Sequence, residues 1–556
     1  GSEDLALDAI DADLSRALLQ EDTQRTRALL TLRKAAPIFA WSQGKNRETA
    51  FMLFKNPGWL TRFVHNVDAG DDPNRSLEVL QALYEHDPRA FKEKFEFCLA
   101  YSVVWDAFPG HPWIPNCGQP EEDGLLKNYS FYLNNEKKMA IRPGTLPCEL
   151  NVFVVATGLT REERAWVLRQ YDARTLIPSV LYDSVPWTFM NEVTLSPAHG
   201  KGLDLAYTLE NIKKIGGCCM DQAYFTENIV RLFGIPAVFA VDGGHAFCGV
   251  FKKDADPGKA WDFDVGRFFN LPFFTGRLVK DSRIYYQGMV ADPTDLRNVM
   301  TEGDVRLIGA FYQEAGSIEK MEESDLYIES ACWIDDRECK GELTDELEAG
   351  KWRELHQDLL QKALTLNGYN RDAWQHLSRT ASEIGMTEKE TWYWIQKAEE
   401  LLLHDYPGFY LSLLEGLAPD INSQARRDAI FEAVRKTLGQ EHPHLSCYLK
   451  AVEGKVWLRR GELEKGIACF LFPLEEYEKN DRILSTALLH LESIDPFLLT
   501  EQEIIDAHKM IFRCLSKMDR KNSLIEGAQK RSAASLFKSY TQLGQIEKAN
   551  QYKKYL

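Results

Sequence analysis

The stretch of sequence that decides the fold is GGCCMDQAYFTENIVRLFGIPA, residues 216–237. Two glycines allow a sharp turn, and Cys219 then opens a segment in which small or apolar residues recur at helical spacing. The segment ends in Gly234 and Pro236, residue types that terminate helices. The sequence therefore predicts an amphipathic helix that carries a thiol on its first turn.

A cysteine at the start of a helix has the chemistry of a nucleophile. The first N–H groups of a helix lack internal acceptors and carry partial positive charge, which lowers the pKa of a thiol placed there. His245 follows in GGHAF on an expected strand, and Asp262 and Asp264 follow in WDFDV on the next. Cysteine, histidine and aspartate in this order supply a nucleophile, its base and a residue that orients the base. Strand alternation places both aspartates on one face, so pattern alone does not choose between them.

These motifs resemble the core of the transglutaminase-like superfamily of papain-type thiol enzymes. That family carries Gly-x-Cys, an acidic residue two positions later and alanine four positions later, matched here by Gly217, Cys219, Asp221 and Ala223. Its helix commonly ends in Arg-x-x-Gly-Ile-Pro-Ala, matched by residues 231–237. The match selects Cys219 over the adjacent cysteine as the nucleophile.

The resemblance also implies the roles of the other site residues. Cys219 is the expected nucleophile and His245 the general base and acid. Asp264, which follows a tryptophan by three residues as in the family, is expected to orient the imidazole. The backbone N–H of Cys219 and the indole of Trp187 are the expected oxyanion donors. Phe247 departs from the family, which usually has tryptophan there.

The implied activity is acyl transfer from an amide through an acyl-thioester. The acceptor is water in a peptidase or amidase and an amine in a cross-linking enzyme. Hydrolysis is favoured, because water is always present and bacterial members of the family are often protease-like. A binding scaffold with an inactive core is the alternative from another functional class, and the complete set of cysteine, histidine and aspartate argues against it.

The predicted fold class is α+β, with a helix packed on an antiparallel sheet and helical regions on both sides of this core in the sequence. The expected parts are a helical N-terminal domain with an irregular segment and a hairpin across Asn134 and Asn135 (1–145), a transglutaminase-like catalytic domain (146–305), an acidic connector (306–350) and a helical-hairpin domain (351–556). Within the catalytic domain we expect a helix over 160–171 and strands at 237–241, 245–252 and 260–265.

The C-terminal region resembles tetratricopeptide repeats in part. The segments RGELEKG, around Gly461, and LGQIEKA, around Gly544, share a turn glycine with a small residue five positions later. Their separation is not a multiple of the repeat length of about 34 residues, so an irregular helical solenoid is expected. Such a surface is expected to hold a protein partner, and the catalytic domain to act on a protein or peptide.

The overall composition limits the functions further. The chain has 556 residues and a net charge of -17, which disfavours broad contact with a nucleic-acid backbone. No apolar run is long enough to span a membrane, and no metal or nucleotide motif is present, so no cofactor is expected. The eleven cysteines show no disulfide framework, although Cys332 and Cys339 would be candidates to pair in an oxidising compartment. The start Gly1-Ser2 looks like a cloning scar, which leaves both a removed signal peptide with export and a cytoplasmic location open.

Overall fold

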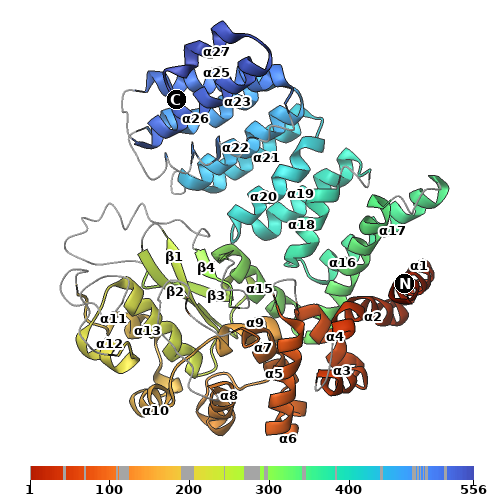
Figure 1. The fold of residues 1–556 in the computed structure, drawn as a ribbon, viewed down its shortest axis with the longest axis vertical. Coiled ribbons are helices and arrows are strands. Elements are labelled where there is room, and N and C mark those ends of the chain that lie inside the picture. Colours follow the sequence, from red (N-terminus) through yellow and green to blue (C-terminus); the bar gives the residue numbers. More distant parts are fainter. Residues whose placement is uncertain are drawn as a thin grey trace. The chain divides into compact units, whose positions relative to one another are not determined.

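The structure is a computed structural model of the chain. It describes residues 2–556 apart from 42–45, 68–70, 108–110, 112–123, 189–205, 243–244, 268–288, 294–298, 341–345, 382–384, 439–442, 479–483, 485–486, 489, 492–493, 495–498 and 519–522. The described residues fall into two compact units, one up to Ala373 and one from Trp374 onward (Figure 1). Each unit is considered by itself below.

The N-terminal part of the first unit is helical. Its helices are α1 (Ser2–Leu19), α2 (Thr23–Trp41), α3 (Asn46–Phe54), α4 (Pro57–Asn66), α5 (Pro73–His86), α6 (Pro88–Glu93), α7 (Phe95–Val104), α8 (Gly124–Asn134) and α9 (Cys148–Val155). Asp72 caps α5 and Asp87 caps α6, and each is followed by a proline, which suits the first position of a helix. The apolar faces of α4, α5, α7 and α9 meet in one core.

The predicted hairpin across Asn134 and Asn135 is wrong. Its first strand was expected at residues 129–133, but these residues lie in α8, which ends at Asn134. Tyr129 and Tyr132 are three positions apart, so a helix places them on the same face, and both are fully buried in the core. Helical burial of these two rings therefore outweighs the strand propensity of the aromatic residues.

A five-stranded antiparallel sheet forms the centre of the first unit. Its strands are β1 (Ala237–Asp242), β2 (His245–Phe251), β3 (Trp261–Val265), β4 (Met289–Ala291) and β5 (Val299–Thr301), in the order β3-β2-β1-β4-β5. The predicted strands at 237–241, 245–252 and 260–265 are confirmed as β1, β2 and β3. The pair β4 and β5 was not predicted. The α+β class is therefore correct at the level of a small antiparallel sheet among helices.

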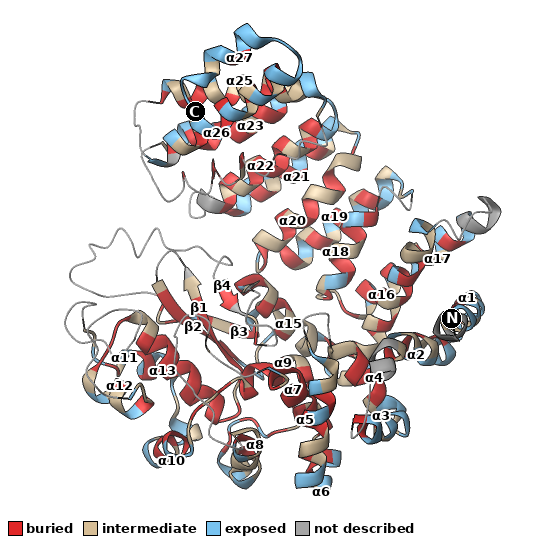
Figure 2. Cartoon of the chain, viewed as in Figure 1, coloured by how far each residue is buried: buried red, intermediate tan, exposed pale blue. Residues whose placement is uncertain are grey.

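The helix predicted from residues 216–237 is α13 (Cys219–Leu232), and it packs on β1 and β2. Its other sides are covered by α10 (Arg161–Gln170), α11 (Pro178–Asp183) and α12 (Leu209–Ile215). Figure 2 shows α13 as buried over most of its length, and its buried residues run from Asp221 to Leu232. A helix enclosed in this way holds its first residue in a fixed place, which is what a nucleophile requires.

The expected helix over 160–171 is confirmed as α10. Thr160 caps it: the Thr160 hydroxyl accepts from the Glu163 N–H at 3.3 Å, and the Glu163 carboxylate accepts from the Thr160 N–H at 3.0 Å. This capping box satisfies backbone donors at the helix start.

Residues 306–350, predicted as an acidic connector, contain the rest of α15 (Glu302–Ala315), α16 (Ile318–Cys339) and the start of α17 (Glu346–Leu366). The acidic side chains of α16 have partners within the first unit: Glu322 pairs with Arg27 at 3.3 Å. Cys332 and Cys339 form no disulfide with each other: they lie seven residues apart on this helix, about 10 Å along its axis, which is too far for one.

The second unit consists of helices. They are most of α18 (Arg371–Thr380), with α19 (Glu388–Leu402), α20 (Pro407–Leu417), α21 (Gln424–Leu438), α22 (Pro443–Arg459), α23 (Leu463–Glu476), α25 (Glu501–Lys517), α26 (Ser523–Gln542) and α27 (Ile546–Lys553). The predicted turns at Gly461 and Gly544 separate α22 from α23 and α26 from α27, and both helix pairs are in contact. Across both units, no helix in the described part of the chain is long and apolar enough to cross a membrane.

Candidate active site

The start of α13 explains the residue pattern before the nucleophile. Gly216 ends α12 with a φ of 93°, and a Cβ there would lie 2.2 Å from the carbonyl oxygen of Pro186. A Cβ on Gly217 would lie 2.3 Å from Cβ of Asp221. Asp221 caps the helix, because its Oδ2 accepts from the Cys218 N–H at 2.7 Å. The glycine pair and the acidic residue are therefore both required by the backbone path.

Cys219 is the first residue of α13, and the pKa of its thiol is lowered. A hydrogen bond with the Cys218 thiol is the largest cause. Burial opposes it, and charge attraction from His245 and the N–H of Ala246 add to the lowering. The same bond, with burial and the charge of Asp221, raises the pKa of Cys218. The two shifts run in opposite directions and favour the thiolate on Cys219 rather than on Cys218, while the nucleophilic role of Cys219 stays a prediction.

Other described thiols behave differently. Burial raises the pKa of Cys98, Cys447 and Cys514 to about 12 and that of Cys469 to about 11. These thiols are protonated at neutral pH and act as apolar core residues. The environment of Cys219 is what favours a thiolate.

His245 is brought to Cys219 by the sheet. It is the first residue of β2, whose strand packs on α13. Its Nε2–H donates to the carbonyl oxygen of Gly266 at 2.7 Å, which assigns the tautomer and leaves Nδ1 as the nitrogen that can take a proton from the thiol. The structure therefore brings together the predicted nucleophile and the predicted base.

Asp264 does not occupy its predicted position beside His245. Its side chain is exposed, and its N–H donates to Asp262 Oδ1 at 3.0 Å. The Asp262 carboxylate pairs with Lys252 at 2.8 Å. In the described part of the chain, neither carboxylate contacts the imidazole. Alternation along β3 is the reason: Trp261, Phe263 and Val265 are buried, so the aspartates point the other way.

A backbone carbonyl from the turn after β3 takes the place of the carboxylate. Gly266 has a φ of 77°, and a Cβ there would lie 2.2 Å from the ring of Tyr182. The Tyr182 hydroxyl donates to the carbonyl oxygen of Ala246 at 2.7 Å and lies 3.5 Å from that of Cys219. The buried Tyr182 therefore links α13, β2 and the turn that orients His245. Sequence reasoning missed Tyr182, and the glycine after WDFDV was the available signal for the turn.

A buried ion pair fixes the same turn. Arg267 contacts Glu302, the first residue of α15, and its Nε donates to the carbonyl oxygen of Phe263 at 3.0 Å. Its guanidinium lies 4.3 Å from the ring centre of Phe247. Arg306 also contacts Glu302, at 2.9 Å. Because both ends of the turn are held by these contacts, the Gly266 carbonyl has little freedom to move away from His245.

Trp187 lies beside the loop that precedes the nucleophile. Its backbone forms a parallel bridge with Gly217, and the next residue, Thr188, donates to the Gly217 carbonyl at 3.1 Å. Gln222 holds the same segment through its Nε2, which donates to the carbonyl oxygen of Val185 at 3.0 Å. The oxyanion role of the Trp187 indole stays a prediction.

Two variants separate the roles of Asp264 and Gly266. We expect Asp264→Asn to change the alkylation rate of Cys219 less than about twofold, because an exposed side chain without a contact to His245 is removed. Gly266→Ala should slow it at least fivefold, since one lost hydrogen bond is worth about 1 kcal/mol and the new methyl group displaces the turn. The measurement is the rate of iodoacetamide labelling. A larger decrease in the labelling rate for Asp264→Asn would indicate that the Asp264 carboxylate does act on His245.

No protein-family model matches this sequence, and no curated protein or solved structure matches it. The proposed function therefore rests on the residues at the start of α13 and on their chemistry.

Proposed function

We propose that the chain is a cysteine-dependent acyl-transfer enzyme that acts on amide bonds through an acyl-thioester and transfers the acyl group to water. The observation that carries this proposal is the lowered pKa of the Cys219 thiol, at the first turn of a buried helix and beside His245. Perturbed titration at a nucleophile with a base beside it marks functional sites. The helix, the three strands after it and their order in the chain support the resemblance to transglutaminase-like enzymes.

The first half of the reaction forms the thioester. The Cys219 thiol gives its proton to His245, and the sulfur attacks the amide carbon, so that a C–S bond forms and the carbonyl oxygen becomes an oxyanion. The N–H of Cys219 has no acceptor in the described part of the chain and is placed to stabilise this oxyanion, with the Trp187 indole as the proposed second donor. The imidazolium of His245 then protonates the leaving amine as the C–N bond breaks.

The second half releases the Cys219 thiolate. His245 takes a proton from water, and the resulting hydroxide attacks the thioester carbon. The C–S bond breaks, the carboxylic acid leaves, and the thiolate is left beside the imidazolium of His245, which is the state that starts the next cycle. The Gly266 carbonyl accepts from Nε2 of His245 in both halves and so keeps Nδ1 turned toward the reacting atoms. A carbonyl is a weaker partner for imidazolium than a carboxylate, and the acidity of Cys219 offsets this difference.

The test is the pH dependence of alkylation. Full-length protein in which the exposed Cys332 and Cys339 are replaced by serine is treated with iodoacetamide, and labelled peptides are identified by mass spectrometry. We expect Cys219 to be labelled already at about pH 6, where an ordinary thiol is less than about 1% ionised. The rate should stay constant down to the lowered pKa and fall as the pH drops through it.

The same protein distinguishes the alternatives. Labelling of Cys219 that rises only above about pH 8, as for ordinary thiols, would favour an inactive scaffold and contradict the proposal. For the acceptor, unfolded casein is incubated with the protein and a fluorescent primary amine. We expect new peptide termini or released ammonia, with no fluorescent amine bound to casein. Fluorescent casein would instead show transfer of the acyl group to amines.

A further inference from the structure

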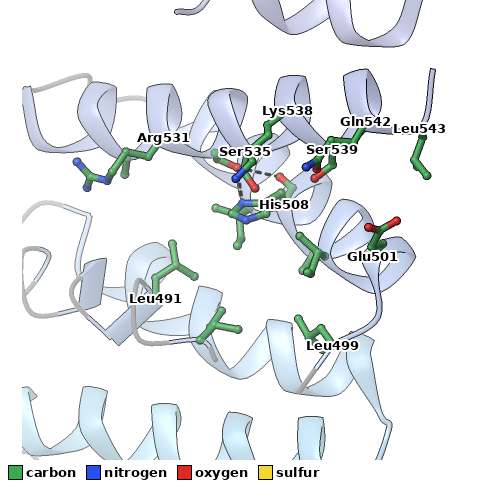
Figure 3. A pocket seen from close by; sticks show the side chains of 16 residues that line it. Leu491, Leu499, Glu501, His508, Arg531, Ser535, Lys538, Ser539, Gln542 and Leu543 are labelled. Atoms are coloured by element: carbon green, nitrogen blue, oxygen red, sulfur yellow. Dashed lines mark hydrogen bonds between the residues drawn. The ribbon is translucent and has the colours of Figure 1, made fainter. Parts of the chain in front are cut away.

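A groove in the second unit runs along the helical hairpin of α25 and α26 (Figure 3). Its volume is about 630 Å³, within the range of sites that hold small molecules or short peptide segments. The described residues that line it all belong to the second unit, so it is separate in sequence from the thiol site. Positions ten residues apart on α25 line it, which gives a length of about 15 Å.

The floor of the groove is apolar. It consists of side chains from one face of α25, from α26 and from the segment that precedes α25: Ile504, Ala507, Ile511, Ala528, Leu491 and Leu499. Leu543, at the end of the lining, is 41% exposed, and Ile546, three residues further along the chain and outside the lining, is 53% exposed. Exposed apolar surface of this kind, bordered by polar residues, marks a binding surface.

The wall formed by α26 is polar and has unused hydrogen-bonding groups. Ser535 and Ser539 line the groove as half-buried residues, and Lys538 and Gln542 lie on its rim. Within the described part of the chain, the side chains of these four residues make no hydrogen bond or ion pair. Ser532 differs, since its hydroxyl donates to the carbonyl oxygen of His508 at 3.0 Å. The unpartnered groups are therefore free to meet a ligand.

The charged residues that line the groove indicate the charge of its ligand. Arg531 and Lys538 are both on α26, seven residues and about 10 Å apart, and among the lining residues that the structure describes Glu501 is the one acidic residue. This basic wall stands out in a chain whose net charge is -17. A ligand with several carboxylates along one side complements it.

We propose that this groove binds a short acidic peptide segment of a partner protein, with leucine-like side chains on the apolar floor and carboxylates toward Lys538 and Arg531. A peptide backbone also supplies donors and acceptors for the hydroxyls of Ser535 and Ser539. A fatty acid would cover these hydroxyls with methylene groups and leave them unsatisfied, and it has one carboxylate rather than several. The proposal does not depend on the activity of Cys219.

The test uses the full chain with Cys219→Ala, so that binding is not confused with acyl transfer. The probe is a short fluorescein-labelled peptide in which aspartate alternates with leucine, and binding is followed by fluorescence anisotropy. We expect saturable binding that Lys538→Glu weakens about tenfold or more. Lys530→Glu is the matched control: the exposed Lys530 is on the same helix but does not line the groove, and its reversal should leave binding unchanged.

Three results would overturn the proposal. The first is no binding of the peptide, and the second is equal weakening by Lys538→Glu and Lys530→Glu, which would indicate diffuse charge attraction. The third is binding of dodecanoate that depends on Lys538 while the peptide does not bind, which would assign the groove to an acyl chain. A peptide with lysine in place of aspartate should not bind.

Discussion

Replacing His245 with alanine is expected to slow alkylation of Cys219 at about pH 6 by about a hundredfold and cleavage of an amide by about 10⁴-fold or more. The variant removes an imidazole whose charge helps to lower the pKa of Cys219, and the pKa then moves up toward that of an ordinary thiol. When the pH lies below the pKa, each unit by which the pKa of Cys219 rises lowers the fraction of thiolate about tenfold. Amide cleavage falls further, because the leaving amine also loses its acid. The measurements are labelling rates across pH and release of new termini from casein.

Two variants control this experiment. Cys218→Ala removes the thiol that hydrogen bonds to Cys219, so labelling at acidic pH should also slow. Near pH 8 or above, however, Cys218→Ala should recover most of its cleavage activity, whereas His245→Ala should not, since only the latter lacks the base. His404→Ala removes an imidazole on the surface and should behave like the unmodified chain. Equal cleavage by His245→Ala and His404→Ala would contradict the proposed mechanism.

The parts of the fold that local sequence dictates were predictable. The start of α13 is set by a glycine pair and an acidic cap, and β1 to β3 are long enough to show strand composition between turns. The strands β4 and β5 have three residues each, which is too short for alternation to be visible, and only pairing with β1 and with each other forms them. Long-range pairing of this kind leaves no local signal.

The candidate site was predictable where side chains carry the chemistry. Cys219 and His245 were named from their residue types and order, and the structure brings them together. The hydrogen-bond acceptor for the His245 ring could not be predicted in this way. It is the main-chain carbonyl of Gly266, and every residue type carries such a carbonyl. Tyr182 was missed for a related reason: it acts through contacts with Ala246 and Gly266, both distant from it in sequence. The family pattern favours Asp264, but alternation along β3 turns its side chain away from His245, and the sequence alone does not show which face of β3 is buried.

The acidic composition of residues 306–350 predicts a connector, and the ion pairs of α16 show why this prediction is misleading. Glu322 is 3.8 Å from Arg62, whose side chain is 5% exposed. Arg62 also binds Glu96 at 2.7 Å and Glu149 at 2.8 Å. An acidic run that lies against a buried arginine is part of the packed unit, and nothing within the run itself reveals the distant partner.

This buried cluster makes Arg62→Leu the variant with the largest expected effect on stability, a loss of about 3–5 kcal/mol in the free energy of unfolding of the first unit. Leucine fills part of the volume but leaves Glu96 and Glu149 without the cation they share, whereas Glu322 keeps its pair with Arg27. Arg75→Leu is the matched control, because the pair of Arg75 with Glu78 is about half exposed and such pairs contribute about 0–1 kcal/mol. The measurement is urea unfolding of the full chain, with hydrogen exchange of peptides from α4 and α7 to assign the transition to the first unit.

The pH dependence of that loss supplies an independent check. Burial by itself raises the pKa of Glu149, but the charge and hydrogen bonds of Arg62 outweigh it and leave the pKa lowered. A lowered folded-state pKa contributes stability above the unfolded-state value and loses it as the pH falls through the folded-state value. In Arg62→Leu the charge and hydrogen bonds of Arg62 are lost, and burial then outweighs the smaller lowering effects of a backbone hydrogen bond and of His65. The pKa of Glu149 should therefore rise, and its protonation in mild acid should recover part of the lost stability. The difference between Arg62→Leu and the unmodified chain should therefore be smaller near pH 5 than near pH 7. A difference that is the same at both values would mean that lost packing, rather than an unpaired buried carboxylate, destabilises the variant.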